Sequence, residues 1–125
     1  MLYQFPHKTG QYVVEVIEEI GDQLLVKILA VLKHPRQGDL HSPNEVENVF
    51  FHERKALSQF EKRYTTAQFL KAYNEEVPNY IESLKSSIYE LEEKMKKKNN
   101  AYSDQALKCI EQLKKDYSRQ YKVNI

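Results

Sequence analysis

Apolar residues in the last part of the chain repeat at a helical spacing, and this pattern constrains the fold more than any other feature. Six of them, from Val77 to Met95, are spaced by 4, 3, 4, 3 and 4 residues, which places them on one helix face. A second stripe follows the turn signal Asn99–Asn100, and it comprises Tyr102, Ala106, Cys109, Ile110, Leu113, Tyr117 and Tyr121. We expect an antiparallel two-helix hairpin over 77–125 with Leu84, Ile88 and Leu91 facing Ile110 and Leu113.

The ends of the first helix carry recognisable signals. Pro78 suits a first helical turn, whereas Asn79 followed by Glu82 suits a capping box, so two starts remain open. Lysines gather at the other end, between Lys94 and Lys98, where cations complement the helix dipole. We interpret this lysine run as a solvated helix end.

The first half of the chain predicts a sheet. Residues 11–20 and 24–33 are rich in β-branched and alternating apolar positions, and Gly21–Asp22 between them predicts a hairpin turn. Short strands are also expected over 49–52 and 67–71, while 53–64 fits a strand or a helix. Four or five short antiparallel strands within 1–76 indicate a small, strongly curved sheet or barrel. We expect this α+β chain to form one compact unit, with the hairpin of 77–125 packed on the sheet.

Charge and cysteine content restrict the function. The formal net charge is +1, which argues against a dedicated nucleic-acid binder, although 1–76 carries nine basic and eleven acidic residues and 77–125 ten and seven. The single cysteine, Cys109, lies on an apolar stripe and is expected to be buried and reduced. The start of the chain has neither a secretory signal nor a cysteine for acylation. We therefore expect a cytoplasmic protein.

No catalytic motif is recognisable. Three scattered glycines form no phosphate-binding loop, so no cofactor is expected. The richest polar positions are His34, Arg36, Gln37, Asp39 and His41, followed by His52, Glu53, Arg54 and Lys55. The histidine spacings match no familiar metal site, and we favour hydrogen bonding that holds the loop against the sheet over a metal-dependent hydrolase.

Small β-barrels also bind single-stranded RNA through basic grooves and aromatic platforms. The side chains that would supply both are Phe50, Phe51, Arg54, Lys55, Arg63 and Tyr64. The acidic balance of residues 1–76 argues against this alternative, so RNA binding ranks second.

Two stretches, 32–41 and 49–57, together with 76–84, resemble the kinase-associated protein B (KapB) family of spore-forming bacilli. The resemblance extends over nearly the whole chain. It implies an SH3-like β-barrel followed by a helical hairpin. It also implies an accessory role beside a membrane sensor histidine kinase that feeds the sporulation phosphorelay. The family is sometimes labelled a lipoprotein, and this sequence departs from that label because it has no acylatable cysteine near its start.

The histidines limit what such an accessory protein can do. A phosphotransfer domain carries its histidine on an exposed helix, but all four histidines, His7, His34, His41 and His52, precede the hairpin. We therefore expect a non-enzymatic adaptor that modulates phosphoryl flow without carrying the phosphoryl group. Its partner would be the sensor kinase or its response regulator, bound through 34–43 and 52–55, since exposed loops commonly carry binding. Peripheral attachment to a membrane through the kinase, and assembly of the chain into a homo-oligomer, are left open.

Overall fold

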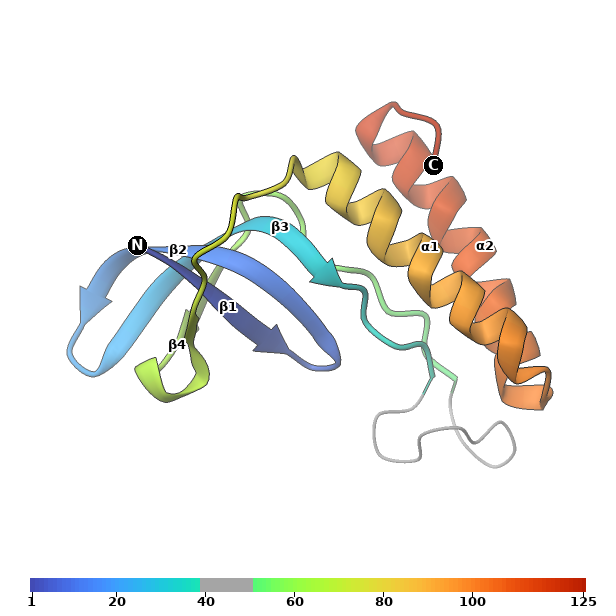
Figure 1. Ribbon diagram of the computed structural model, residues 1–125, viewed down its shortest axis with the longest axis horizontal. Coiled ribbons are helices and arrows are strands. Elements are labelled where there is room, and N and C mark those ends of the chain that lie inside the picture. Colours follow the sequence, from blue (N-terminus) through green and yellow to red (C-terminus); the bar gives the residue numbers. More distant parts are fainter. Residues whose placement is uncertain (39–50) are drawn as a thin grey trace.

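The β-branched runs form the centre of a five-stranded antiparallel sheet, with two helices beside it (Figure 1). The computed structural model describes residues 1–38 and 51–125. Across the sheet the order is β4-β3-β2-β1-β5. The strands are β1 (Leu2–His7), β2 (Gly10–Ile20), β3 (Gln23–Lys33), β4 (Lys62–Thr65) and β5 (Lys71–Ala72).

Three irregularities in the pairing of β2 with β3 decide which side chains reach the core. Val13 pairs with Ala30 and Val14 pairs with Ile28, so Leu29 is an extra residue on β3. A bulge of this kind exchanges the two faces of the strand. Ile28 consequently lies in the main core and Ala30 in a smaller cluster on the other face. The single unbroken alternation expected for 24–33 is therefore wrong.

Closure into a barrel is not observed. Within the described residues, the edge strands β4 and β5 pair only with β3 and β1, so the curved sheet stays open. The predicted strand over 67–71 is a short 3₁₀ helix, η1 (Ala67–Phe69), followed by the two-residue β5. Of the strand expected over 49–52, Phe51 and His52 have no regular structure, and residues 49 and 50 lie outside the described ranges.

The outcome differs for two strands. β1 is not predicted from the sequence. β4 covers the end of the ambiguous stretch 53–64, so its strand alternative is right at that end and its helical alternative is wrong. The predicted hairpin turn is confirmed, since Ile20 pairs with Gln23 across Gly21–Asp22, with Gly21 at a positive φ of 63°.

The helical hairpin follows the predicted stripes from Ile81 onward, whereas Val77 precedes the helix and packs against the smaller cluster of the sheet. Helix α1 (Tyr80–Lys98) begins after Asn79, whose side chain accepts a hydrogen bond from the Glu82 backbone N–H, so of the two starts the cap at Asn79 is correct. Asn99 adopts the left-handed conformation expected of a helix end. Helix α2 (Ala101–Tyr121) follows at once, capped by Asn100.

One hydrophobic cluster joins the sheet to both helices. It includes Val14 and Ile28 from the sheet, Leu84 and Ile88 from α1, and further α2 residues such as Ile110, Leu113 and Tyr117. The Val31 backbone N–H also donates to the Ser83 Oγ at 2.9 Å, a buried hydrogen bond between β3 and α1. The hairpin therefore packs on the end of β3 (Figure 1).

Candidate functional site

The polar stretch singled out in the sequence forms a pair of extended segments, 34–38 and 51–57, that run beside each other below the hairpin (Figure 1). We call them the paired segments. The Gly38 N–H donates to the His52 carbonyl at 2.9 Å. The Gln37 side chain bridges them further, because its Oε1 accepts from the Arg54 N–H at 2.8 Å and its Nε2 donates to the Arg54 carbonyl at 3.0 Å.

His34 is buried, with 2% of its surface exposed, and both ring nitrogens are engaged. Nδ1 lies 2.9 Å from the Pro35 carbonyl and Nε2 lies 2.8 Å from the Tyr117 hydroxyl. A carbonyl only accepts, so we assign the proton to Nδ1; Nε2 then accepts from Tyr117. Burial lowers the pKa of His34 to about 4. His34 is therefore a neutral structural link to α2. Hydrogen bonding within the loop was expected, but this bond holds the loop against a helix and not against the sheet.

Three tyrosine hydroxyls, one from each packed element, secure the second paired segment. The Ala56 N–H donates to Tyr117 at 2.8 Å and the Leu57 N–H donates to Tyr12 at 3.1 Å. The Tyr80 hydroxyl donates to the Leu57 carbonyl. Burial raises the pKa of Tyr12 to about 12 and raises the pKa values of Tyr80 and Tyr117 as well. The sequence did not identify these tyrosines as anchors. Of the stripe tyrosines expected in the core, Tyr102 and Tyr117 are buried, whereas Tyr121 is half-buried.

The remaining candidate residues divide between support and surface. Gln37 is buried, and Arg54 is half-buried with its Nε donating to the Gly38 carbonyl at 2.9 Å. The exposed side chains are Arg36, His52, Glu53 and Lys55. Asp39 and His41 lie outside the described residues.

Glu53 and Lys55 both reach toward α2. Partial burial raises the pKa of Glu53, and the neighbouring Asp116 carboxyl raises it further. The Lys55 Nζ donates to the Gln120 side chain at 3.3 Å and lies 5.8 Å from the centre of the Tyr117 ring. The exposed face of the paired segments is therefore continuous with α2.

This geometry gives little support to metal binding or to RNA binding. In the part of the chain that the structure describes, no three His, Cys, Asp or Glu side chains gather in a metal-binding group. Of the proposed RNA platform, Phe51 packs on Tyr102 with ring centres 5.7 Å apart. Arg63 is paired with Glu61 at 2.6 Å. Phe50 lies outside the described residues.

Cys109 departs from expectation, since it is half-buried rather than buried. Partial burial raises the pKa of its thiol and the Glu53 carboxylate raises it further, which disfavours the reactive thiolate. Cys109 does belong to the apolar stripe seen in the sequence, but in the structure it lies at the edge of that stripe.

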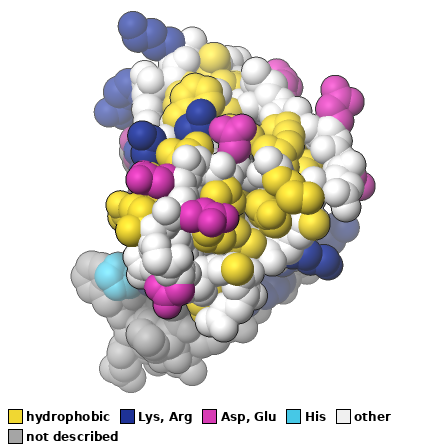
Figure 2. Space-filling view, turned by 90° about the vertical axis from the view of Figure 1, so that its left-hand side faces the viewer, with side chains coloured by type: hydrophobic (Ala, Val, Ile, Leu, Met, Phe, Trp, Pro, Cys, Tyr) yellow, Lys and Arg dark blue, Asp and Glu magenta, His cyan; other side chains and the backbone are white. Residues whose placement is uncertain are grey.

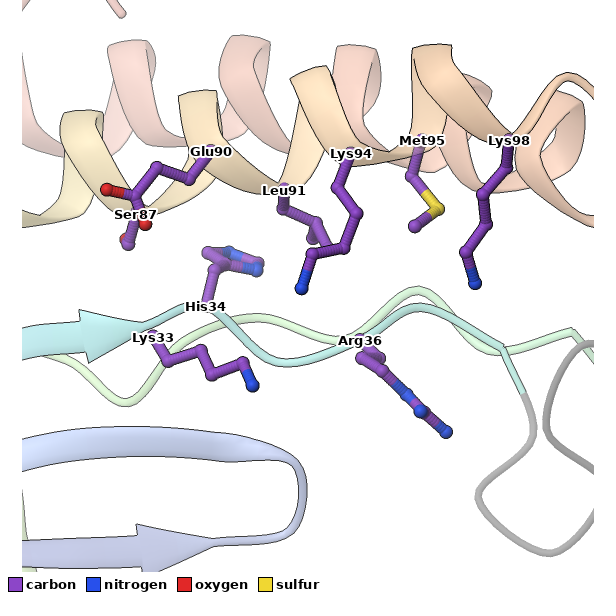
Figure 3. A pocket seen from close by; sticks show the side chains of 9 residues that line it. All are labelled: Lys33, His34, Arg36, Ser87, Glu90, Leu91, Lys94, Met95 and Lys98. Atoms are coloured by element: carbon purple, nitrogen blue, oxygen red, sulfur yellow. The ribbon is translucent and has the colours of Figure 1, made fainter.

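A basic recess between α1 and the end of β3 was missed (Figure 3). Its volume is about 230 Å³, and its charged lining residues are Lys33, Arg36, Glu90, Lys94 and Lys98. The i, i+4 spacing of Lys94 and Lys98 could have indicated one side of this recess. The sequence does not show that β3 packs against these lysines.

Apolar side chains are also exposed on the sheet, at the end away from the helices. Figure 2 shows hydrophobic side chains gathered on that face, with carboxylates between them. The large exposed residues of the sheet and its connections are Ile17, Ile20, Phe60, Tyr64 and Phe69. Neither helix has an apolar run long enough to cross a bilayer, judged over the two described stretches.

These features define a small α+β protein with an open antiparallel sheet and a docked helical hairpin, whose central polar residues hold the fold together. Residues 7–118 match the family described as Kinase associated protein B. The chain belongs to this KapB family, as the sequence motifs predicted.

Two relatives support the assignment. The chain is 38% identical over 111 residues to the Kinase-associated lipoprotein B of Bacillus subtilis (strain 168), covering 89% of this chain and 87% of that protein. The crystal structure of kinase-associated protein B from Bacillus cereus superposes with a TM-score of 0.76 at 32% identity, covering 94% of each chain. The fold of the family is thus confirmed for this chain.

Proposed function

We propose that this protein is a non-enzymatic accessory protein that binds a sensor histidine kinase or its response regulator in the sporulation phosphorelay. It modulates phosphoryl flow without carrying the phosphoryl group. The kinase-associated names of the family and of its relatives support the association. We further propose a cytoplasmic location, with any contact to the membrane made through the kinase.

The state of His34 is the observation that supports the absence of phosphoryl transfer through this residue. A phosphoryl acceptor needs an accessible ring nitrogen, whereas both nitrogens of this buried ring are hydrogen-bonded inside the protein. Neither helix contains a histidine, so the hairpin offers no phosphotransfer group.

We place the partner contact on the exposed residues of the paired segments, mainly Arg36, His52, Glu53 and Lys55. His34, Gln37 and Arg54 would act indirectly, because they hold the two segments in register. Asp39 and His41 stay candidates from the sequence alone.

The test combines binding with phosphoryl transfer. The full chain, immobilised on a sensor surface, is expected to retain the cytoplasmic portion of the kinase or the response regulator. The pair Arg36→Ala and Lys55→Ala should weaken retention about tenfold, while the exposed control pair Lys71→Ala and Lys108→Ala should leave it unchanged. Radiolabelled phosphate should pass from kinase to regulator at a changed rate without labelling this chain. Label on this chain, or retention of neither partner, would reject the proposal.

A further inference from the structure

We infer that the basic recess between α1 and the end of β3 binds an acidic segment of a partner protein, with carboxylates on either side of an apolar residue. This inference rests on the proposed function, because the segment belongs to the partner. It adds a second place of contact, which shares Arg36 with the paired segments, and the chemistry of the ligand.

Cations from two separate elements line the recess. Lys33 ends β3 and Arg36 follows it, while Lys94 and Lys98 lie one turn apart on α1. Figure 3 shows the two α1 lysines extending toward the β3 segment, whereas Lys33 and Arg36 extend from that segment on its side away from α1. The partial negative charge at the end of α1, about half an elementary charge, is smaller than the charge of these four groups.

Three of the four cations have little internal compensation among the described residues. Within the described residues, Lys33, Arg36 and Lys94 form no ion pair. Lys98 is positioned over the Tyr102 ring, 5.3 Å from its centre. The one carboxylate of the lining, Glu90, is turned toward Ser87 in Figure 3. An anion in the recess would therefore relieve repulsion between like charges.

The other polar groups of the recess are already engaged, so recognition depends on side-chain charge. The Arg36 backbone N–H donates to the Thr9 hydroxyl at 2.7 Å, and the Ser87 hydroxyl donates to the Leu84 carbonyl at 2.9 Å. His34 is bonded on both nitrogens. Dedicated phosphate sites commonly present several backbone N–H groups, and these contacts supply none. Flexible lysines suit carboxylates spread along a chain.

The volume of the recess and its apolar floor favour a short peptide segment as the ligand. The volume of about 230 Å³ is below the range of about 300–1,000 Å³ that is typical for small-molecule sites. Leu91 and Met95 close the floor, and a methionine adapts readily to an apolar neighbour. The four cations are exposed around this apolar floor, so an apolar side chain flanked by carboxylates fits the recess.

Binding of a fluorescein-labelled peptide, Glu-Glu-Leu-Asp-Glu-Leu, to the full chain tests the inference by fluorescence anisotropy. The double variant Lys33→Gln and Lys94→Gln should weaken binding about tenfold. The control Lys108→Gln and Lys115→Gln removes the same charge from the exposed face of α2 and should change binding less than about twofold. Replacement of the two recess lysines by arginine should preserve it, and circular dichroism checks that each variant folds.

Three results would overturn the inference: equal weakening by both glutamine pairs, equal binding of a peptide with Gln and Asn in place of its acids, or no peptide binding. Displacement of the peptide by a few millimolar inorganic phosphate, or tighter binding to phosphatidylserine vesicles, would assign the recess to another ligand. If the Lys33→Gln and Lys94→Gln variant still retains the kinase or regulator fully, this inference fails and the proposed function stands. If the peptide binds and neither partner is retained, the proposed function fails and the acidic-segment site stands.

Discussion

At the scale of single residues, buried hydrogen-bonding groups determine the role of the polar stretch. His34 and Tyr117 form a continuous chain from the Pro35 carbonyl to the Ala56 N–H, in which each atom has a partner. His34, a candidate metal ligand in the sequence, thus holds the fold together through its hydrogen bonds. Leaving one buried member unpaired costs more than the hydrogen bond itself contributes.

The free energy of unfolding should fall in mild acid because of His34. Its pKa is about 4 in the fold against 6.5 when unfolded, so between these values the unfolded chain binds a proton that the folded chain does not. The contribution of His34 to the free energy of unfolding is fully present above pH 6.5. It declines as the pH falls, and about 2 kcal/mol of it is lost at pH 5. Urea titrations at pH 7.5, 6 and 5 measure it.

The control for this pH effect is His34→Gln, which should show a shallower decline over the same range. Burial also lowers the pKa of His7, so the difference between the two proteins isolates the contribution of His34. Parallel pH profiles for both proteins would contradict the assignment of His34 as neutral.

Removing the Tyr117 hydroxyl should destabilise the protein. Tyr117→Phe leaves the Ala56 N–H and the His34 Nε2 without partners inside the core, at a cost of about 2 kcal/mol. Tyr89→Phe is the matched control, since Tyr89 is 58% exposed and should shift stability by less than about 0.5 kcal/mol. Chemical denaturation of both variants gives the comparison, and equal stabilities would count against the tyrosine anchor.

At the scale of elements, the sequence was most informative where one hydrophobic repeat continues through a whole element. The stripes of α1 and α2 and the turn at Gly21–Asp22 depend on local spacing and local turn chemistry, and they were predicted correctly. The bulge at Leu29 and the open sheet edges depend on pairing between distant strands, which a single sequence does not display. The basic recess was missed for the same reason, because Lys33 and Lys94 meet only through packing.

Helix capping gives a prediction at this scale. Asn100 accepts from the Ser103 N–H at 2.8 Å, and the Ser103 hydroxyl accepts from the Asn100 N–H at 2.8 Å. Asn100→Ala should lower stability by about 1 kcal/mol. Because the two residues form one reciprocal box, adding Ser103→Ala should cost less than the sum of the single changes. Strict additivity in thermal denaturation would show that the box does not act as a unit.

At the scale of the whole molecule, the sheet and the hairpin share their core. Helix α1 covers β3, and the buried bond from Val31 to Ser83 crosses between them. The hairpin of 77–125 has too little apolar interior of its own to fold alone. We therefore propose that residues 1–76 and 77–125 are one cooperative unit.

Cooperativity is checked by unfolding the intact chain and its parts. Far-ultraviolet circular dichroism and tyrosine fluorescence should report the same midpoint for the full chain. A peptide of 77–125 alone should be less helical than in the intact protein and should lack a cooperative transition. Two separated transitions, or a stable isolated hairpin, would show that the halves are independent domains.

The side-chain bridges between the paired segments have a dynamic consequence. The link through Gln37 belongs to no strand ladder, and local opening of such a region costs less than opening the sheet. In hydrogen–deuterium exchange, the amides of Gly38 and Arg54 should exchange before those of β2 and β3. The surface assigned to partner binding would then open before the centre of the sheet.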